Sequence, residues 1–337
     1  MTRNTLLAAI DCGKSDTKIC VLEKGITGET LRRDSFPTAM GIGTNGGTDL
    51  LTGVHTFSSN ATGIGMEYTI GSGELPVKAD DSFSKNSKVN KVCTLYGIAR
   101  NVSDGDTVNV VIGCPLTIFM NVEERDEYCK SIVPKGLIAC VVDGKRISFT
   151  IDKRLVCAEA IGYKDRHPEC FRPGMDAAII DIGGLNMNMT SVHDGIVVIE
   201  DAHTNKLGGR RLIADVQKRL QDHEIEVSDQ QVIDAIRRGY VKQHDEEKQK
   251  YSKAVIDDAV RIFVDDIESA LKKNWKNYDT LELHFTGGTS YLIREELESR
   301  FGKFANFEKS YEDARFANAE GFVKHLAGKI ARDAASR

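Results

Sequence analysis

Residues 5–18 read TLLAAIDCGKSDTK and carry the clearest structural signal in the sequence. An apolar run ends at Asp11, a turn containing Gly13 follows, and a second strand-like segment returns from Thr17. Backbone N–H groups in such a tight turn can bind a phosphate, and an adjacent carboxylate can hold a hydrated Mg2+ ion. The stretch therefore predicts a hairpin that offers both groups to one ligand. A charged hairpin with no ligand is the alternative interpretation.

Residues 177–190, which read AAIIDIGGLNMNMT, repeat this pattern about half a chain later. The apolar run ends at Asp181, and Gly183 and Gly184 make the turn. Two adjacent glycines directly after a strand favour close approach of another group to the backbone, and a β-bulge is the alternative. The spacing predicts two similar domains, each giving a turn and a carboxylate to one nucleotide.

A third turn lies in residues 285–292, which read FTGGTSYL. A strand-like segment runs into Gly287 and Gly288, and Thr289 begins a helical segment. The N-terminus of a helix can receive a phosphate or another electron-rich group, because its first N–H groups are not used within the helix. Three such turns in one chain indicate a nucleotide site more specifically than any one of them does.

The composition is typical of a globular protein with room for two domains. The chain has 337 residues, of which 41% are hydrophobic. With 45 basic and 50 acidic residues the formal charge is −5, which gives no general attraction to nucleic acid or anionic membranes. No apolar run approaches the length that spans a bilayer, and the first residues do not resemble a secretion signal. We therefore expect a cytoplasmic protein.

The eight cysteines and eight histidines show no metal-binding pattern. No two cysteines are spaced as Cys-x-x-Cys, and most of them lie in apolar segments. Reduced thiols in the protein core are therefore a better interpretation than disulfides or a zinc site. The scattered histidines exclude, at the level of the sequence, a metalloenzyme built on histidine and cysteine.

Periodicity and turn signals predict alternating strands and helices. Strands are expected at residues 6–11, 17–23, 66–71, 107–112, 137–142, 146–151, 195–200 and 281–285. Helices are expected at residues 89–101, 121–132, 210–223, 254–272 and 315–334. Another helix should begin at Ser228, with Gln231 completing a capping box and Gly239 beyond its end.

The expected domain organisation follows from the two repeated motifs. Residues 1–170 form a first lobe with a small insertion at about 33–85, a region rich in Gly, Ser, Thr and Asn. Residues 171–337 form a second lobe with a helical part at about 210–260. The last helix, 315–334, is expected to return to the first lobe.

Together the three motifs resemble those of the ATPase superfamily that contains actin, the large heat-shock chaperones and the sugar kinases. Residues 11–18 resemble its first phosphate motif, 181–188 its second, and 285–293 its adenosine motif. Within the superfamily the chain is most similar to the ParM-type bacterial actins that segregate plasmids. Residues 108–117, VNVVIGCPLT, resemble the core strand that ends in a Gly-x-Pro turn in those proteins.

The resemblance implies an α/β, actin-like fold. Each of the two lobes would have a mixed sheet flanked by helices, and the nucleotide would bind in the cleft between the lobes. The phosphates would be cradled by Gly13, Lys14, Ser15, Thr17, Gly183 and Gly184, and Lys18 would contact the β- and γ-phosphates. Asp11 and Asp181 would hold Mg2+ through water. The adenosine would be bounded by Gly208, Gly209, Gly287, Gly288, Thr289 and Leu292.

For hydrolysis the resemblance implies Glu159, within LVCAEA at residues 155–160, as the acid that positions water. A surface glutamate at a helix start is the alternative. Asn188 lies where the family usually has an aspartate, and an amide cannot accept the water's proton. Two interpretations follow: hydrolysis is slow, or the attacking water is held mainly by Glu159. Leu185 and Asn186 lack the hydroxyls expected there, which leaves a phosphate contact open.

The implied function is a filament-forming ATPase, bound to ATP and Mg2+, that moves plasmid DNA through a DNA-binding adaptor. Because the chain is acidic, we expect no direct binding to DNA and no membrane binding. GTP is not excluded. The alternatives are a small-molecule kinase, which needs an aspartate base, and a chaperone-like or reactivating ATPase, which would favour a separate substrate-binding domain. A membrane-bound shape-maintaining filament would need an amphipathic insertion.

Overall fold

The computed structural model describes residues 4–25, 28–43, 53–63, 65–71, 75–78 and 85–336, and the chain divides into two compact units. Unit 1 comprises residues 1–167 and 316–337, and unit 2 comprises residues 168–315. The expected lobe boundary was at residue 170, and the units change over at residue 167. Residues from Phe316 onward belong to unit 1.

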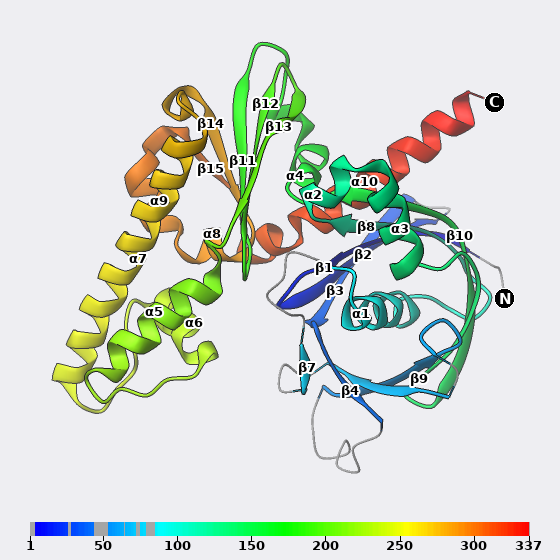
Figure 1. Cartoon of the computed structure of the whole chain (residues 1–337), viewed down its shortest axis with the longest axis horizontal. Helices are drawn as coiled ribbons and strands as arrows, with labels where there is room; N and C mark the ends of the chain where they lie inside the picture. The colour runs from blue at the N-terminus through cyan, green and yellow to red at the C-terminus, as the bar shows by residue number, and fades with distance from the viewer. Residues whose placement is uncertain are drawn as a thin grey trace. The chain divides into compact units, whose positions relative to one another are not determined.

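Unit 1 is built on a mixed sheet with the strand order β3-β2-β1-β8-β10-β9-β5-β6-β4-β7 (Figure 1). The strands are β1 Thr5–Cys12, β2 Asp16–Gly25, β3 Gly28–Pro37, β4 Ala39–Ile42, β5 His55–Ser59, β6 Glu67–Ile70, β7 Val77–Lys78, β8 Thr107–Cys114, β9 Gly136–Val142 and β10 Lys145–Ala158. Strands β1 and β2 form the predicted hairpin, and β1, β8 and β10 run parallel to one another. The aspartate at the end of β1 and the turn after it therefore lie at the edge where the parallel strands end.

The insertion expected at residues 33–85 is only partly described. Residues 33–37 complete β3, which pairs with β2 along its whole length, so they belong to the main sheet. The strand expected at residues 66–71 is confirmed as β6. Residues 44–52, 64, 72–74 and 79–84 of the expected insertion lie outside the described part.

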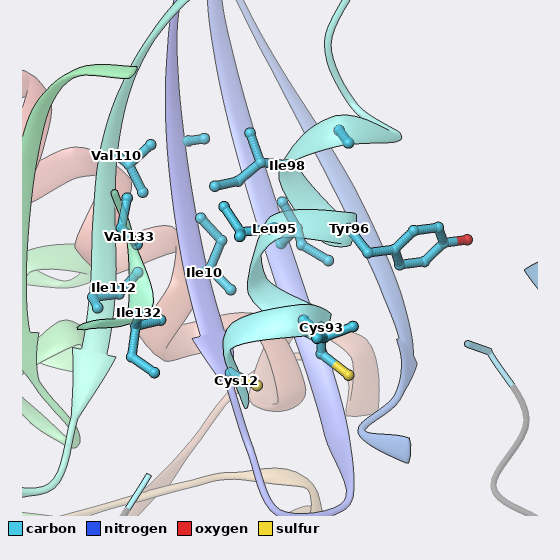
Figure 2. Packing of buried hydrophobic residues seen from close by; sticks show 14 of the residues in the cluster. Ile10, Cys12, Cys93, Leu95, Tyr96, Ile98, Val110, Ile112, Ile132 and Val133 are labelled. Carbon is cyan, nitrogen blue, oxygen red and sulfur yellow. The ribbon is translucent and has the colours of Figure 1, made fainter. Parts of the chain in front are cut away.

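The helices of unit 1 are α1 Lys88–Ala99, α2 Leu116–Met120, α3 Val122–Ile132, α4 Ile161–Arg166 and most of α10 Tyr311–Ala335. Helix α1 crosses one face of the β1–β3 strands, where Leu95 and Ile98 lie beside Ile10 (Figure 2). Ile132 and Val133, from the end of α3, fill the space next to β8. Burying each such side chain stabilises the unit by roughly 1.5–3 kcal/mol.

The opposite face of this sheet is covered by α10. Phe316, Phe322 and Leu326 are buried there against Leu7 of β1 and Val111 of β8. The helix expected at residues 315–334 is confirmed, although it begins four residues earlier. Helices on both faces fix the hairpin in the interior of unit 1, which restricts the position of its turn.

Unit 2 has a second mixed sheet with the strand order β13-β12-β11-β14-β15. The strands are β11 Asp176–Ile182, β12 Met187–His193, β13 Ile196–Asn205, β14 Glu282–Thr286 and β15 Ala305–Phe307. In unit 2, β11 forms an antiparallel hairpin with β12 and runs parallel to β14. In unit 1, β1 forms the same hairpin with β2 and runs parallel to β8. The repeated sequence pattern therefore corresponds to a repeated strand arrangement.

The helices of unit 2 are α5 Gly209–Gln221, α6 Asp229–Arg238, α7 Glu246–Asn274, α8 Gly288–Leu292 and α9 Arg294–Phe301. The capping box of Ser228 and Gln231 is present, and Gly239 ends α6 in the left-handed conformation, as predicted. Helix α7 starts eight residues before the expected position, because the Asp245 side chain accepts hydrogen bonds from two N–H groups of its first turn.

All eight cysteines are free, and seven of them are buried, which confirms their placement as core thiols. Among the described residues, no helix combines the length and apolar character needed to cross a membrane.

Candidate functional site

The first candidate turn joins β1 and β2. The Gly13 N–H donates to the carbonyl oxygens of Asp11 (3.0 Å) and Asp16 (2.9 Å). A Cβ on Gly13 would lie 2.7 Å from the Asp16 oxygen, so only glycine lets the turn close this tightly. Lys14 is buried and Ser15 is exposed at the turn. The Thr17 hydroxyl instead lies in the core, where it bonds the Thr38 hydroxyl at 2.9 Å.

Asp11 is enclosed and faces two ammonium groups. Lys18 Nζ lies 3.4 Å from its Oδ2 atom, and Lys85 Nζ lies 3.4 Å from its Oδ1 atom. Burial alone would raise the pKa of Asp11, but the nearby charges of Lys18 and Lys85 outweigh it and hold that pKa below its ordinary value. The side chain is therefore a carboxylate, which is the form that a hydrated divalent cation requires.

Glu159 is brought to the same place by the end of β10. Its side chain is 12% exposed, and its Oε1 atom lies 2.5 Å from Lys85 Nζ. Ala160, the next residue, has a φ of 69°, a conformation that costs a non-glycine residue free energy and that often marks functional sites. This enclosure contradicts the alternative of a solvent-exposed surface glutamate.

Lys85 lies beside both of these predicted site residues, Asp11 and Glu159, and the sequence did not reveal it. It precedes α1 in a stretch rich in serine and lysine that matches no motif, so no local signal distinguishes it. Burial by itself would lower the pKa of Lys85, but Glu159 and Asp11 raise it well above its ordinary value. Lys85 therefore remains an ammonium ion between two predicted site carboxylates.

The second candidate turn joins β11 and β12 in unit 2. The Gly183 N–H donates to the Asn186 carbonyl at 2.9 Å, which closes the turn as in the first hairpin. Asp181 is 8% exposed and lies opposite Asn188 in the ladder. The Asn188 side-chain oxygen accepts a hydrogen bond from the Thr204 hydroxyl at 2.8 Å, so β13 fixes the orientation of this amide.

The third turn is packed directly against the second. Gly287 has a φ of 86°, and a Cβ there would lie 2.4 Å from Asp181 Oδ1 and 2.5 Å from the Ile182 oxygen. The Thr289 hydroxyl donates to the Gly183 carbonyl at 2.9 Å. The third turn and the second turn therefore form one continuous structure around Asp181.

The start of α5 completes this structure. The Gly209 N–H donates to the Gly183 oxygen (3.0 Å), and the Arg210 N–H donates to the Gly184 oxygen (2.7 Å). A Cβ on Gly208 would lie 2.2 Å from the carbonyl carbon of Leu185, so glycine is required there.

Two further residues of unit 2 were predicted to contact the nucleotide, and the structure places them differently from each other. Gly288 lies close to Arg315 and Tyr311, at the edge of the same group of turns. Leu292 packs against the hydrophobic core of the unit, which is a structural position.

Two polar atoms, one in the second turn and one at the end of β14, have no partner within the described residues. The Asn186 side-chain oxygen and the Thr286 hydroxyl are buried and form no hydrogen bond there. Thr286 lies directly opposite Asp181 in the β11–β14 ladder. Because buried polar groups are nearly always hydrogen-bonded in folded proteins, this position is suited to a polar ligand.

One group of possible metal ligands lies elsewhere in unit 1. The ligand atoms of Cys157, Asp165 and His325 lie within 4.8 Å of one another. His325 Nδ1 and Asp165 Oδ2 already share a hydrogen bond of 2.9 Å, and burial raises the pKa of the Cys157 thiol. A protonated thiol is a poor metal ligand, so the His325–Asp165 pair is better explained as a link between α10 and α4.

Comparison with known proteins supports these assignments of fold. Residues 9–162 match the family model described as the N-terminal domain of actin-like proteins. No curated protein matches the sequence.

Three solved structures illustrate the likeness. The archaeal actin homologue Ta0583 is 17% identical, with a TM-score of 0.77 over 96% of this chain and 99% of that one. A filament structure of Alp12 is 24% identical, with a TM-score of 0.70 over 97% and 99%. ParM of Bacillus thuringiensis with ATP is 16% identical, with a TM-score of 0.71 over 97% and 100%.

The predicted resemblance to actin-like proteins, ParM among them, is thus confirmed, and so is the predicted fold class with two mixed sheets flanked by helices. The chain has the actin-like fold, and its residues 9–162 match the family model of the N-terminal domain of actin-like proteins.

Proposed function

We propose that this protein is an ATPase that binds a magnesium nucleotide and assembles into filaments. The observation that carries the proposal is the pair of matching hairpins, each of which places a buried aspartate beside a turn closed by glycine. The fold supports it too, because similar structures include B. thuringiensis ParM with ATP and the archaeal homologue with ADP.

In this proposal the phosphates bind to the backbone of the Gly13 and Gly183–Gly184 turns. Lys18 offsets the charge of the β- and γ-phosphates, and the base and sugar lie against the Gly208–Gly209 and Gly287–Thr289 segments. Assigning both sets of turns to one nucleotide rests on the order of the three motifs along the chain. Purine choice between ATP and GTP is left to the binding assay.

The residues fit a magnesium ion. Mg2+ prefers oxygen ligands and keeps several waters, so it is commonly held by one or two carboxylates together with phosphate oxygens. Asp11, ionised and enclosed, and Asp181, adjacent to the unpartnered Thr286 hydroxyl, offer that donor set. When bound, Mg2+ would neutralise charge on the transferred phosphate.

Glu159 is the residue proposed to orient the attacking water. A carboxylate within hydrogen-bond reach of water can align it with the γ-phosphate and accept its proton as the bond forms. Asn188 can also hold water but cannot accept a proton, and its oxygen is already used by Thr204. We therefore assign the role of accepting the water's proton to Glu159, and we expect slow ATP turnover.

Filament formation follows from linkage between nucleotide and conformation. A nucleotide that binds one arrangement of the two units better than another shifts the population toward it. If only that arrangement fits the neighbouring subunit, nucleotide state controls assembly. Contacts between copies that repeat head to tail without closing give an open polymer. The likeness to the Alp12 filament structure supports the proposal that this chain forms filaments.

The biological task we propose is plasmid segregation, with a separate adaptor that binds DNA. The net charge of −5 argues against direct binding of the polymer to DNA. The likeness to ParM structures supports this part of the proposal.

Sedimentation and light scattering with ATP, with ADP and without nucleotide test the assembly part of the proposal. We expect assembly with ATP and reduced or absent assembly with ADP. No assembly up to tens of micromolar protein, a range set by typical weak-interface affinities of roughly 1 μM to 1 mM, would contradict the filament. ATP turnover that depends on an added small molecule would then favour a kinase.

A further inference from the structure

Lys85 joins two carboxylates that come from different strands of unit 1. Its side chain is 6% exposed, and its Nζ atom lies 2.5 Å from Glu159 Oε1 and 3.4 Å from Asp11 Oδ1. Asp11 lies near the end of β1, and Glu159 directly follows β10, which is separated from β1 by β8. The lysine therefore bridges the ends of strands that do not pair directly.

The charges explain why a cation is needed at this point. Two carboxylates facing one enclosed space repel each other, and enclosed charges are stable only when they are paired and hydrogen-bonded. Lys18 already lies at one oxygen of Asp11, and Lys85 occupies the other oxygen and reaches Glu159. Two ammonium groups thus balance two carboxylates.

The shorter of the two Lys85 contacts is the one to Glu159. This contact is a close ion pair, whereas Lys85 donates a longer hydrogen bond of 3.4 Å to Asp11 Oδ1. The positive φ of Ala160 restricts the backbone next to Glu159, so the lysine and the turn together limit where the carboxylate can lie.

We propose that Lys85 is a positioning residue that holds the Glu159 carboxylate toward Asp11 and so sets where the attacking water is bound. The inference rests on the proposed ATPase function and deepens it. A positioned carboxylate matters because a displacement of about 1 Å in a catalytic group can cost on the order of 100-fold in rate.

Phosphate release and nucleotide affinity should be measured for the wild type and for Lys85→Met, which keeps much of the side-chain volume and removes the charge. We expect kcat to fall by about tenfold or more, while KM for ATP changes by less than about threefold. Lys88→Met is the matched control, because Lys88 is an exposed lysine three residues away, and it should behave as the wild type.

A double-mutant cycle with Glu159→Gln separates positioning from a general structural role. If Lys85 acts through Glu159, Lys85→Met should cost nothing further once the carboxylate is gone. The double variant also has no unpaired charge between the two positions, so it provides the comparison even if Lys85→Met alone does not fold. Lys85→Arg should recover part of the rate, since it keeps the charge.

Each outcome decides a different question. An active wild type with an unchanged kcat in Lys85→Met overturns the inference alone. A further loss of about tenfold in the Glu159→Gln background, or a loss that appears only in KM, also overturns it. A wild type that binds nucleotide but never releases phosphate overturns the ATPase proposal together with this inference.

Discussion

At Gly287 both the backbone conformation and the surrounding atoms require a glycine. Its φ of 86° is costly for any residue with a Cβ, and that atom would lie within 2.5 Å of both Asp181 Oδ1 and the Ile182 oxygen. The glycine therefore satisfies two requirements, one from its own conformation and one from its neighbours.

Gly287→Ala should lower the free energy of unfolding by clearly more than the roughly 1–3 kcal/mol expected for the strained conformation alone, and it should displace Asp181. Gly239→Ala is the comparison for a positive-φ glycine in open space, because Gly239 has a φ of 85° and a ψ of 1°, against 152° at Gly287, and no atom lies within 4 Å of an added Cβ. Urea denaturation of both variants gives the comparison. If both variants lose the same free energy of unfolding, the contact between residue 287 and Asp181 is unimportant for stability.

Individual residues were predictable where a motif fixes the backbone. Gly13 and Gly287 follow strands and have the close approaches that the glycines suggested, whereas a Cβ on Gly183 would lie 3.5 Å from the Asn186 oxygen, an ordinary contact. Thr17 could not be placed correctly, because strand alternation alone does not tell which face of β2 meets the core. Lys85 could not be found, because its partners are 74 residues away on each side.

Helix α10 depends on a close approach to α4 that uses two glycines. A Cβ on Gly321 would lie 1.7 Å from the Gly162 oxygen, and a Cβ on Gly162 would lie 2.7 Å from the Asn318 oxygen. Backbone atoms cannot move aside as a flexible side chain can, so this contact fixes how α10 covers the sheet of unit 1.

Gly321→Ala should destabilise the protein by about 3 kcal/mol, the upper part of the range for overpacked sites. Gly328→Ala, in the same helix, should instead stabilise it by up to about 1 kcal/mol, because alanine favours helix and only Arg332 comes within 4 Å. Thermal and urea unfolding measure both. A Gly321→Ala protein as stable as the wild type would contradict the packing of these helices.

Glu268 links α7 to α9 at the surface of unit 2. Hydrogen bonds from Lys272, Arg300 and Tyr278 outweigh its partial burial and lower the pKa of Glu268 to about 2. A lowered pKa in the folded state means that the stabilisation is present above the ordinary value near 4.5 and is lost as the pH falls from there toward 2.

Glu268→Gln should therefore destabilise the protein at pH 7, by about 1 kcal/mol for a partly exposed pair. The difference from the wild type should shrink as the pH is lowered below 4.5, because the wild-type carboxylate is then increasingly protonated in the unfolded state. Urea midpoints from pH 7 to pH 3.5 measure this. A difference that stays constant over that range would contradict the assigned ion-pair network.

At the scale of elements, hairpins and capped helices followed from the sequence because their signals are local. The capping box of α6 and the β1–β2 and β11–β12 hairpins are examples. The full length of β13 and the early start of α7 were missed, since pairing with β12 and a single aspartate cap extend them beyond their apolar pattern.

For the molecule as a whole, the repeat of Asp11 and Asp181 predicted two units with related strand arrangements, and two mixed sheets are present. Strand order across unit 1 was not predictable, because the β1–β8, β8–β10 and β5–β9 pairs join strands that are far apart in the sequence and leave no local pattern. Surfaces that join one copy to the next also follow no short motif.

The central claim is that this actin-like chain binds a magnesium purine triphosphate, and isothermal titration calorimetry tests it most directly. With Mg2+ we predict one site for ATP or GTP with a dissociation constant of about 1 μM or lower. Asp11→Ala should abolish the magnesium-dependent part of nucleotide binding, while Asp279→Ala, at an exposed position, should leave nucleotide binding unchanged. Absence of binding to either nucleotide at about 1 mM would contradict the account.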